Sequence, residues 1–240
     1  MYKERRMNTV SIVIGVAFLI CIIAGWARGF FRVLISVAGL IVSIVIAVYA
    51  APALSSYIQK NTEWDDKLAE RIAEKLEFSE MGEETSRGIQ VALIDQLPLP
   101  DIIKDDIMDN NNLETYDILK ATGVYDYIAK SISMVIINGA VFIGLLLLCR
   151  IVFLVLGRLA KGIDNIPIIG EIDKIGGALL GGLKGIIFIW IFFLILSLTS
   201  TMDWSSNLIE SVRQSGILKL LYDNNILLDI VGDLTKVLFR

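Results

Sequence analysis

DKIGGALLGGLKG (residues 173–185) leads directly into IIFIWIFFLIL (residues 186–196), eleven consecutive apolar residues. A long apolar run of this kind predicts a helix that crosses a membrane, because about 20 mostly apolar residues span a bilayer core. Three glycines at its entrance, Gly177, Gly181 and Gly185, are four residues apart and therefore share one helix face. Since small residues let helices approach closely in lipid, this face is predicted to pack against another span, either of this chain or of a partner.

The rest of the chain is as apolar as this segment suggests. Of its 240 residues 55% are hydrophobic, and its mean hydropathy is +0.67, more than soluble domains usually show. Four apolar runs are long enough to span a bilayer: residues 10–25, 33–51, 132–156 and 176–198. The predicted fold class is an all-α membrane protein with four transmembrane helices in two antiparallel hairpins.

The spans and the segments between them divide the chain into four predicted parts. These are a first transmembrane hairpin (1–51), an acidic extramembrane helical insert (52–131), a second transmembrane hairpin (132–200) and an amphipathic C-terminal tail (201–240). The insert holds 17 acidic and 8 basic residues, a local balance of −9, and apolar residues recur in it at the spacing of short amphipathic helices. The tail has the same spacing but no run long enough to span, so we expect it on the membrane surface or packed on the insert.

Several classes of function are disfavoured by composition. The net charge of −4, without a basic patch interleaved with aromatics, argues against a nucleic-acid partner. The chain has no histidine, which removes the commonest general base and metal ligand, and Cys21 and Cys149 lie in separate apolar runs with no CxxC neighbour. No HExxH or GxSxG motif and no carboxylate cluster within a span is present. We therefore expect no catalysis, no cofactor and no metal site.

Two basic residues lie inside the predicted spans. Lys184 is eight residues into the last span, and Arg150 is near the end of the third. A charge at the centre of a membrane helix costs roughly 2.5–3.5 kcal/mol on insertion scales, and less near an end where a long side chain reaches the headgroups. Because consecutive spans are antiparallel, both residues are expected at the same depth, on the side of the first short connection.

The basic residues expected together at this end of the bundle are Arg28, Arg32, Arg150 and Lys184. Two interpretations of the set remain open. The residues either anchor the helix ends by snorkelling to the headgroups, or they form a basic vestibule that binds lipid phosphates or another anion. In the second case Asp164 and Asp173 are the nearby carboxylates that would neutralise it.

The distribution of basic residues predicts an orientation. Seven Lys and Arg residues lie beside the two short connections, against about five near the opposite ends of the spans. The positive-inside rule therefore places the short connections in the cytoplasm. Both termini and the acidic insert are then extracytoplasmic.

Two segments resemble the signatures of a known family. Residues 27–32 (ARGFFR) resemble the RGFxR signature of the colicin V production protein (CvpA) family. Residues 172–185 resemble its second signature, in which D-(R/K)-x-x-G leads to G-x-x-(R/K)-G at the start of the last span. The matched positions are Arg28, Gly29, Phe30, Arg32, Asp173, Gly177, Gly181, Lys184 and Gly185.

The resemblance implies a bacterial inner-membrane protein linked to the production or export of a peptide toxin and to envelope behaviour. The leading hypothesis is an integral membrane protein that assists colicin V-like toxin production or export, or envelope maintenance, through contacts with membrane lipids, a membrane-protein partner or a second copy of itself. The alternative is an oligomeric small transporter or channel subunit. Four spans alone enclose only a small pore, so the glycine face would then have to build a multimer.

Overall fold

The computed structural model describes residues 9–76, 87–97, 99–159 and 170–238, which form helices joined by short turns, with no strand in these ranges. Four of the helices are long and apolar enough to cross a membrane: α1 (Thr9–Arg28), α2 (Phe30–Asn61), α7 (Val124–Leu159) and α8 (Gly170–Leu198). The predicted all-α fold with four membrane-spanning helices is therefore confirmed.

Helix α2 is longer than the apolar run that predicted it. It continues ten residues beyond residue 51 and passes through Pro52 without ending. A proline inside a helix removes one backbone hydrogen bond, which membrane helices tolerate where neighbouring groups satisfy the freed carbonyl. With 32 residues α2 is about 48 Å long. It therefore exceeds a bilayer core of about 30 Å, and its last turns extend beyond that core.

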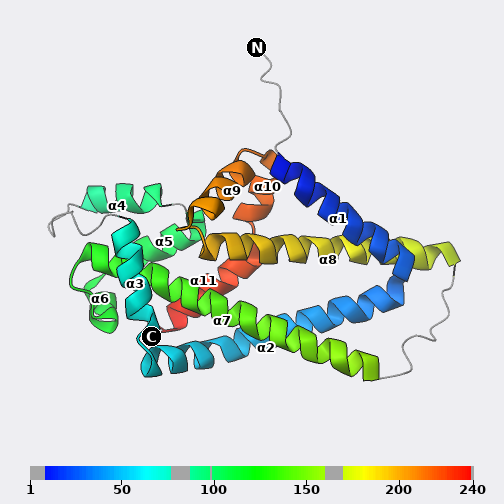
Figure 1. Ribbon diagram of the computed structural model, residues 1–240, viewed down its shortest axis with the longest axis horizontal. Helices are drawn as coiled ribbons and strands as arrows, with labels where there is room; N and C mark the ends of the chain where they lie inside the picture. Colours follow the sequence, from blue (N-terminus) through cyan, green and yellow to red (C-terminus); the bar gives the residue numbers. More distant parts are fainter. Residues whose placement is uncertain (1–8, 77–86, 98, 160–169, 239–240) are drawn as a thin grey trace, which may run out of the picture.

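Each of the four long helices packs mainly on a helix that is not its neighbour in sequence. Helix α1 packs along α8, α2 packs along α7, and α2 also contacts α8. Helices α1 and α2 meet only near their junction and then diverge, and α7 and α8 also diverge from one another (Figure 1). Consecutive helices do run in opposite directions, but each finds its main partner in the other pair. The two predicted hairpins are thus not confirmed as packed units.

The contact between α2 and α7 is built on small residues. Ser43, Ala47, Ala51 and Ser55 are four residues apart on α2, and each is at most 1% exposed. The Ser55 hydroxyl also donates a hydrogen bond to the side-chain oxygen of Asn138 on α7. Hydrogen bonds between membrane helices contribute on the order of 0.6 kcal/mol each, so this bond adds only modestly to the stability of the contact.

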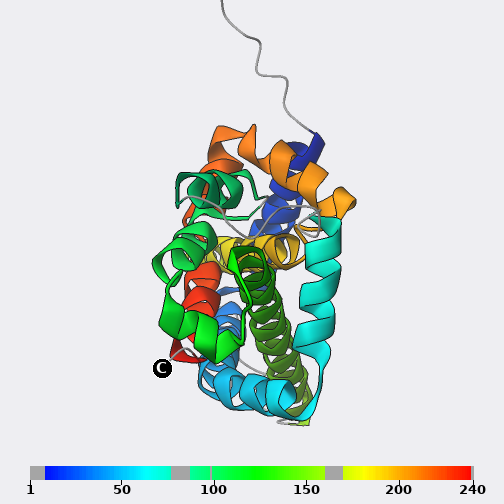
Figure 2. The same cartoon turned by 90° about the vertical axis from the view of Figure 1, so that its left-hand side faces the viewer.

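The acidic insert folds against the first turns of α7. Its helices are α3 (Trp64–Lys75), α4 (Arg87–Gln96), α5 (Asp101–Asp109) and α6 (Leu113–Leu119). Helix α3 lies beside α7, as the end-on view shows (Figure 2). The Ser133 hydroxyl of α7 donates to the carbonyl of Asp65 at 2.8 Å, and the buried Tyr127 hydroxyl donates to the carbonyl of Ile107 at 2.7 Å. Side chains of α7 therefore hold two separate parts of the insert.

The C-terminal tail packs on the spans. It consists of α9 (Asp203–Arg213), α10 (Gly216–Asp223) and α11 (Ile226–Leu238). The Trp190 indole of α8 donates to the carbonyl of Leu221 at 3.1 Å, and the Asn225 amide donates to the carbonyl of Trp190 at 2.9 Å. Tyr222 is fully buried with its hydroxyl 3.0 Å from that of Ser197, and burial raises the pKa of Tyr222 to about 12. This residue therefore stays neutral and hydrogen-bonded at physiological pH.

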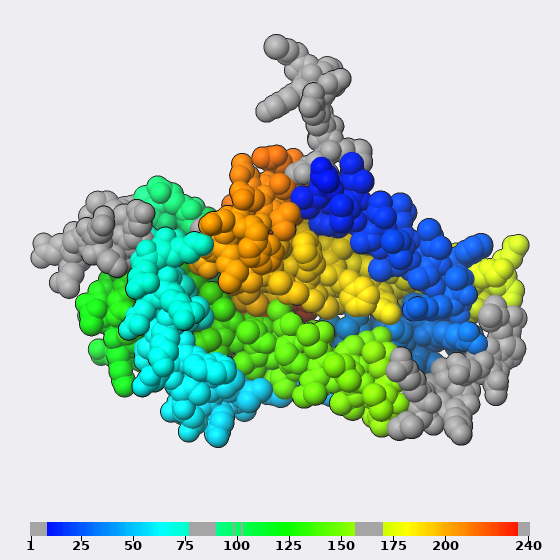
Figure 3. Space-filling model, in the orientation of Figure 1, coloured from blue at the N-terminus to red at the C-terminus, as the bar shows by residue number. Residues whose placement is uncertain are grey.

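The tail also touches the insert. The guanidinium of Arg213 donates to the carbonyl of Leu99 at 2.8 Å, and Lys75 of α3 forms an exposed ion pair with Asp203 of α9 at 3.1 Å. Helices α3 and α9 are neighbours on the molecular surface (Figure 3). Insert and tail thus gather at one end of the long helices, and the junction of α1 and α2 lies at the other (Figure 1).

Candidate functional site

A single residue, Gly29, separates α1 from α2. It is the N-cap of α2, with φ +81° and ψ 163°, a backbone conformation that residues with a side chain rarely adopt. Glycine has no side-chain acceptor for the first amides of the helix, which have no partner within the helix itself. Those amides therefore need an acceptor from elsewhere in the chain.

Asp173, in the first turn of α8, supplies that acceptor. Its carboxylate accepts a hydrogen bond from the backbone N–H of Phe30 at 2.9 Å, across 143 residues of sequence. A negative charge at a helix N-terminus is also favoured by the helix dipole. A Cβ atom on Gly29 would collide with the same carboxylate, so only glycine fits beneath it. The two sequence signatures meet at this contact.

The glycines of α8 lie directly against the backbone of α1. A Cβ atom placed on Gly181 would lie 2.5 Å from the carbonyl oxygen of Cys21 and 3.0 Å from the Cα of Gly25. One on Gly177 would collide with the carbonyl oxygen of Gly25, and one on Gly185 would lie 3.2 Å from the Cβ of Cys21. Helix α1 therefore has its own small-residue stripe, spaced four apart like that of α8, and the two backbones touch along it. The sequence prediction omitted Gly25, although its four-residue spacing from Gly29 was a visible signal.

Arg150 and Lys184 converge on one serine. The Arg150 guanidinium donates to the Ser36 hydroxyl at 2.9 Å and to its carbonyl at 3.3 Å, and the Lys184 ammonium donates to the same hydroxyl at 3.0 Å. The three side chains come from α7, α8 and α2. Gly39, one turn after Ser36, leaves room for the guanidinium, since a Cβ there would lie 3.4 Å from Nη1.

The matching depth of Ser36 and Lys184 follows from the glycine contact. Gly29 and Gly177 touch, with a Cβ on Gly177 only 2.8 Å from the carbonyl carbon of Gly29. Ser36 is seven residues beyond Gly29, and Lys184 is seven residues beyond Gly177. Seven residues of helix rise about 10 Å, so both side chains reach the same level inside the bundle. The packing of α1 on α8 therefore sets the position of Lys184 relative to α2.

The two cations repel one another at this site. Both lie within 3.0 Å of one oxygen atom, so they are no more than about 6 Å apart, a separation that costs about 3 kcal/mol at an effective dielectric constant of 20. A hydroxyl accepts two hydrogen bonds but carries no charge to offset theirs. Of the ion pairs between residues that the structure describes, none involves Arg150 or Lys184.

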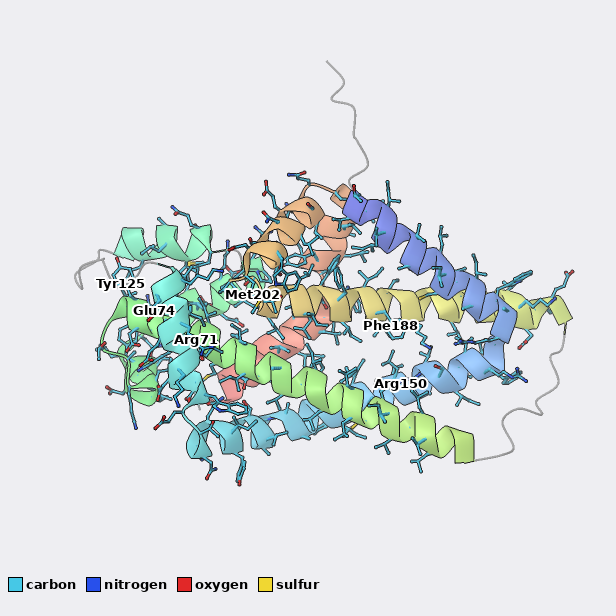
Figure 4. All side chains as sticks on the ribbon, in the orientation of Figure 1. Arg71, Glu74, Tyr125, Arg150, Phe188 and Met202 are labelled. Carbon is cyan, nitrogen blue, oxygen red and sulfur yellow. The ribbon has the colours of Figure 1, made fainter. Side chains whose placement is uncertain are left out.

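Lys184 is not directed simply toward the nearer end of its helix. Its ammonium lies 5.4 Å from the ring centre of Phe188, which is one turn deeper in α8. Phe188 and Arg150 both lie in the region between α8 and α2 (Figure 4). A side chain that snorkelled to the headgroups would carry its charge away from Phe188. The described contacts of the half-buried Lys184 ammonium are thus with Ser36 and Phe188.

The remaining predicted site residues lie around this centre without entering it. Arg28 is exposed at the end of α1, and its charge acts on Lys184 from a distance. Arg32 is partly buried one turn before Ser36 on α2. Asp173 caps α2 and forms no ion pair with either cation, while Asp164 lies outside the described residues.

Sequence reasoning missed Ser36. The available signal was that Ser36 is a polar residue within an apolar run, one turn after Arg32. Together the described groups offer a guanidinium fork, an ammonium and a hydroxyl, which suit an anion. In the described ranges no three His, Cys, Asp or Glu side chains lie close enough to hold a metal ion.

The chain was compared with known families, curated proteins and solved structures. The family model described as colicin V production protein matches residues 10–79 and 118–225, which is most of the chain. Both signature segments lie in the matched ranges, and so do Ser36, Arg150 and Lys184, which we call the cation site. The middle of the acidic insert does not. The searches of curated proteins and of solved structures found no match.

Proposed function

The chain belongs to the colicin V production protein family, and from this premise we propose that it supports the production or export of a colicin V-like toxin, or the maintenance of the envelope, by binding a membrane partner or lipid. It is an integral membrane protein with four membrane-spanning helices. In the proposal it resides in the bacterial inner membrane and acts through contact and not through catalysis.

One observation carries this proposal. Arg150 and Lys184 point at one hydroxyl inside the membrane-spanning helices and have no ion-pair partner among the described residues. Charges inside membrane helices are costly and generally mark a functional site. Two cations with an incomplete set of partners can hold an anionic group of a lipid or of another protein.

The test is complementation in cells that export a colicin V-like toxin and lack their own family member. We expect the wild-type chain to restore toxin activity in the medium. The double variant Arg150→Gln/Lys184→Gln should lower that activity at least tenfold while its amount in the membrane stays normal, because the cationic contact is lost. Two further measurements separate the two proposed processes. Toxin retained inside the cells indicates a defect in export, and poor survival in bile salts indicates a defect in the envelope.

Lys174→Gln is the matched control. Lys174 lies on the same helix, ten residues before Lys184, and is exposed, with its ammonium 5.5 Å from the ring of Trp26. It should complement like the wild type. Full complementation by the double variant at normal abundance would show that the function does not depend on Arg150 and Lys184.

A further inference from the structure

Ser36 is an incomplete partner for two cations. Its hydroxyl oxygen has two acceptor positions, and the Arg150 and Lys184 hydrogen bonds occupy both. The hydroxyl hydrogen has no acceptor among the described residues, so the same group retains a donor. Donor groups from α2, α7 and α8 thus meet here, and no ion pair between described residues neutralises the two cations.

We propose that Ser36, Arg150 and Lys184 bind a phosphate group, carried by a phospholipid headgroup or free in solution. The inference rests on the proposed function, because it names the chemical group that the cation site contacts. It goes beyond that function by assigning Ser36 and by defining the ligand class.

The donor set favours phosphate over a carboxylate. The guanidinium has five N–H donors, of which two contact Ser36, so further donors remain for the oxygens of a ligand, and the ammonium and hydroxyl come from other helices. A carboxylate offers two oxygens in one plane, whereas the four oxygens of a phosphate group, ester oxygens included, are arranged tetrahedrally around phosphorus. Two positive charges also match the one to two negative charges of phosphate esters.

The two cations are partly exposed, so a ligand can reach them from the surface of the helices. Helices α7 and α8 diverge from one another and make few contacts. The neighbouring apolar side chains Leu147, Ile151 and Phe188 are 53%, 58% and 43% exposed. A headgroup therefore has apolar surfaces beside the site for its acyl chains, and this favours the lipid as the source of the phosphate.

Native mass spectrometry of the full-length protein in mild detergent tests the proposal. The protein is titrated with phosphatidylglycerol, with phosphatidic acid and with phosphatidylcholine, whose own choline shields its phosphate. We expect Lys184→Gln and Arg150→Gln each to weaken phosphatidylglycerol and phosphatidic acid binding at least tenfold relative to the wild type. Lys174→Gln should stay within twofold of the wild type, and phosphatidylcholine binding should be alike in all variants.

Inorganic phosphate distinguishes the two sources. Displacement of phosphatidylglycerol from the wild type by millimolar phosphate supports a site that also takes the free ion, and resistance to displacement supports recognition of the headgroup. Unchanged lipid affinity in both glutamine variants overturns the proposal, as does an equal loss in Lys174→Gln.

Ser36→Ala tests the site even if the charge variants fail to fold. It keeps both cations and should still weaken binding at least threefold, and unchanged binding would remove Ser36 from the site. The binding assay is independent of toxin export. Normal phosphate binding without complementation would defeat the proposed function alone, and complementation that depends on the cations without phosphate binding would defeat this inference alone.

Discussion

At the scale of single residues, Asp173 and Gly29 form one structural unit although 144 positions separate them. Gly29 allows the chain to reverse within one residue, and Asp173 provides the N-cap that glycine lacks. Neither role was predictable from its own neighbourhood, because the capping acceptor normally lies within a few residues of the helix start. Sequence reasoning grouped both as signature positions, and only the contact between α1 and α8 brings them together.

Removing this cap should cost a measurable part of the stability. We expect Asp173→Ala to lower the free energy of unfolding by roughly 0.5–2 kcal/mol, the usual range for losing a capping acceptor. Asp173→Asn should lose less, because its amide oxygen still accepts from Phe30 and only the charge is removed. The measurement is unfolding by dodecyl sulfate in mixed micelles. Glu171→Ala, at an exposed position of the same turn, is the control, and a loss as large as that of Asp173→Ala would contradict the capping role.

At the scale of elements, two small-residue contacts decide which helices pair. Hydropathy identified the four spans, and the spacing of Gly177, Gly181 and Gly185 marked the packing face of α8. The partner of that face was not predictable, because a glycine stripe shows that a helix is approached closely without showing by which one. In the structure α1 of the same chain occupies it. An oligomeric transporter or channel, which remains a prediction, would therefore need a different surface for assembly.

Adjacent glycines on α8 test this contact. A Cβ on Gly181 would meet backbone at 2.5 Å, but one on Gly182 would lie 3.7 Å from the nearest atom, Cγ1 of Ile22, at an ordinary contact distance. Gly181→Ala should therefore destabilise the protein by about 1–3 kcal/mol through overpacking. Gly182→Ala should be neutral or stabilising by up to about 1 kcal/mol, because alanine is the better helix former.

The same unfolding assay in mixed micelles compares the two variants with the wild type. Each replaces one glycine by alanine at neighbouring positions of one helix, so any difference between them reports the contact with α1. Equal shifts in the free energy of unfolding, in either direction, would show that α1 and α8 do not pack along Gly181.

At the scale of the whole molecule, the charge at each end of the helix bundle was predictable from the sequence, whereas the contacts that build each end were not. The acidic balance of residues 52–131 and the basic residues near Gly29 were both readable from the chain. The contacts of the tail with the insert match one of the two predicted alternatives, but its packing on the spans was not predicted, because an amphipathic helix shows which face is buried without showing what covers it. Long-range polar contacts, such as Arg213 with Leu99, have no sequence pattern of their own.

The opposite charges of the two ends of the bundle predict the orientation of the protein in the membrane. The insert and the tail share one end of the spans, and Gly29 lies at the other (Figure 1). Because basic residues are retained in the cytoplasm, the Gly29 end should be cytoplasmic and the acidic end extracytoplasmic.

Cysteine labelling in intact spheroplasts tests this orientation. In a background with Cys21→Ala and Cys149→Ala, a membrane-impermeant maleimide should label Glu70→Cys of α3 from outside. Glu171→Cys of α8 should be labelled only after the membrane is opened, since both positions are exposed on the protein and only the bilayer separates them. The reverse pattern would invert the orientation, and equal labelling of both in intact spheroplasts would contradict the placement of the two ends on opposite sides.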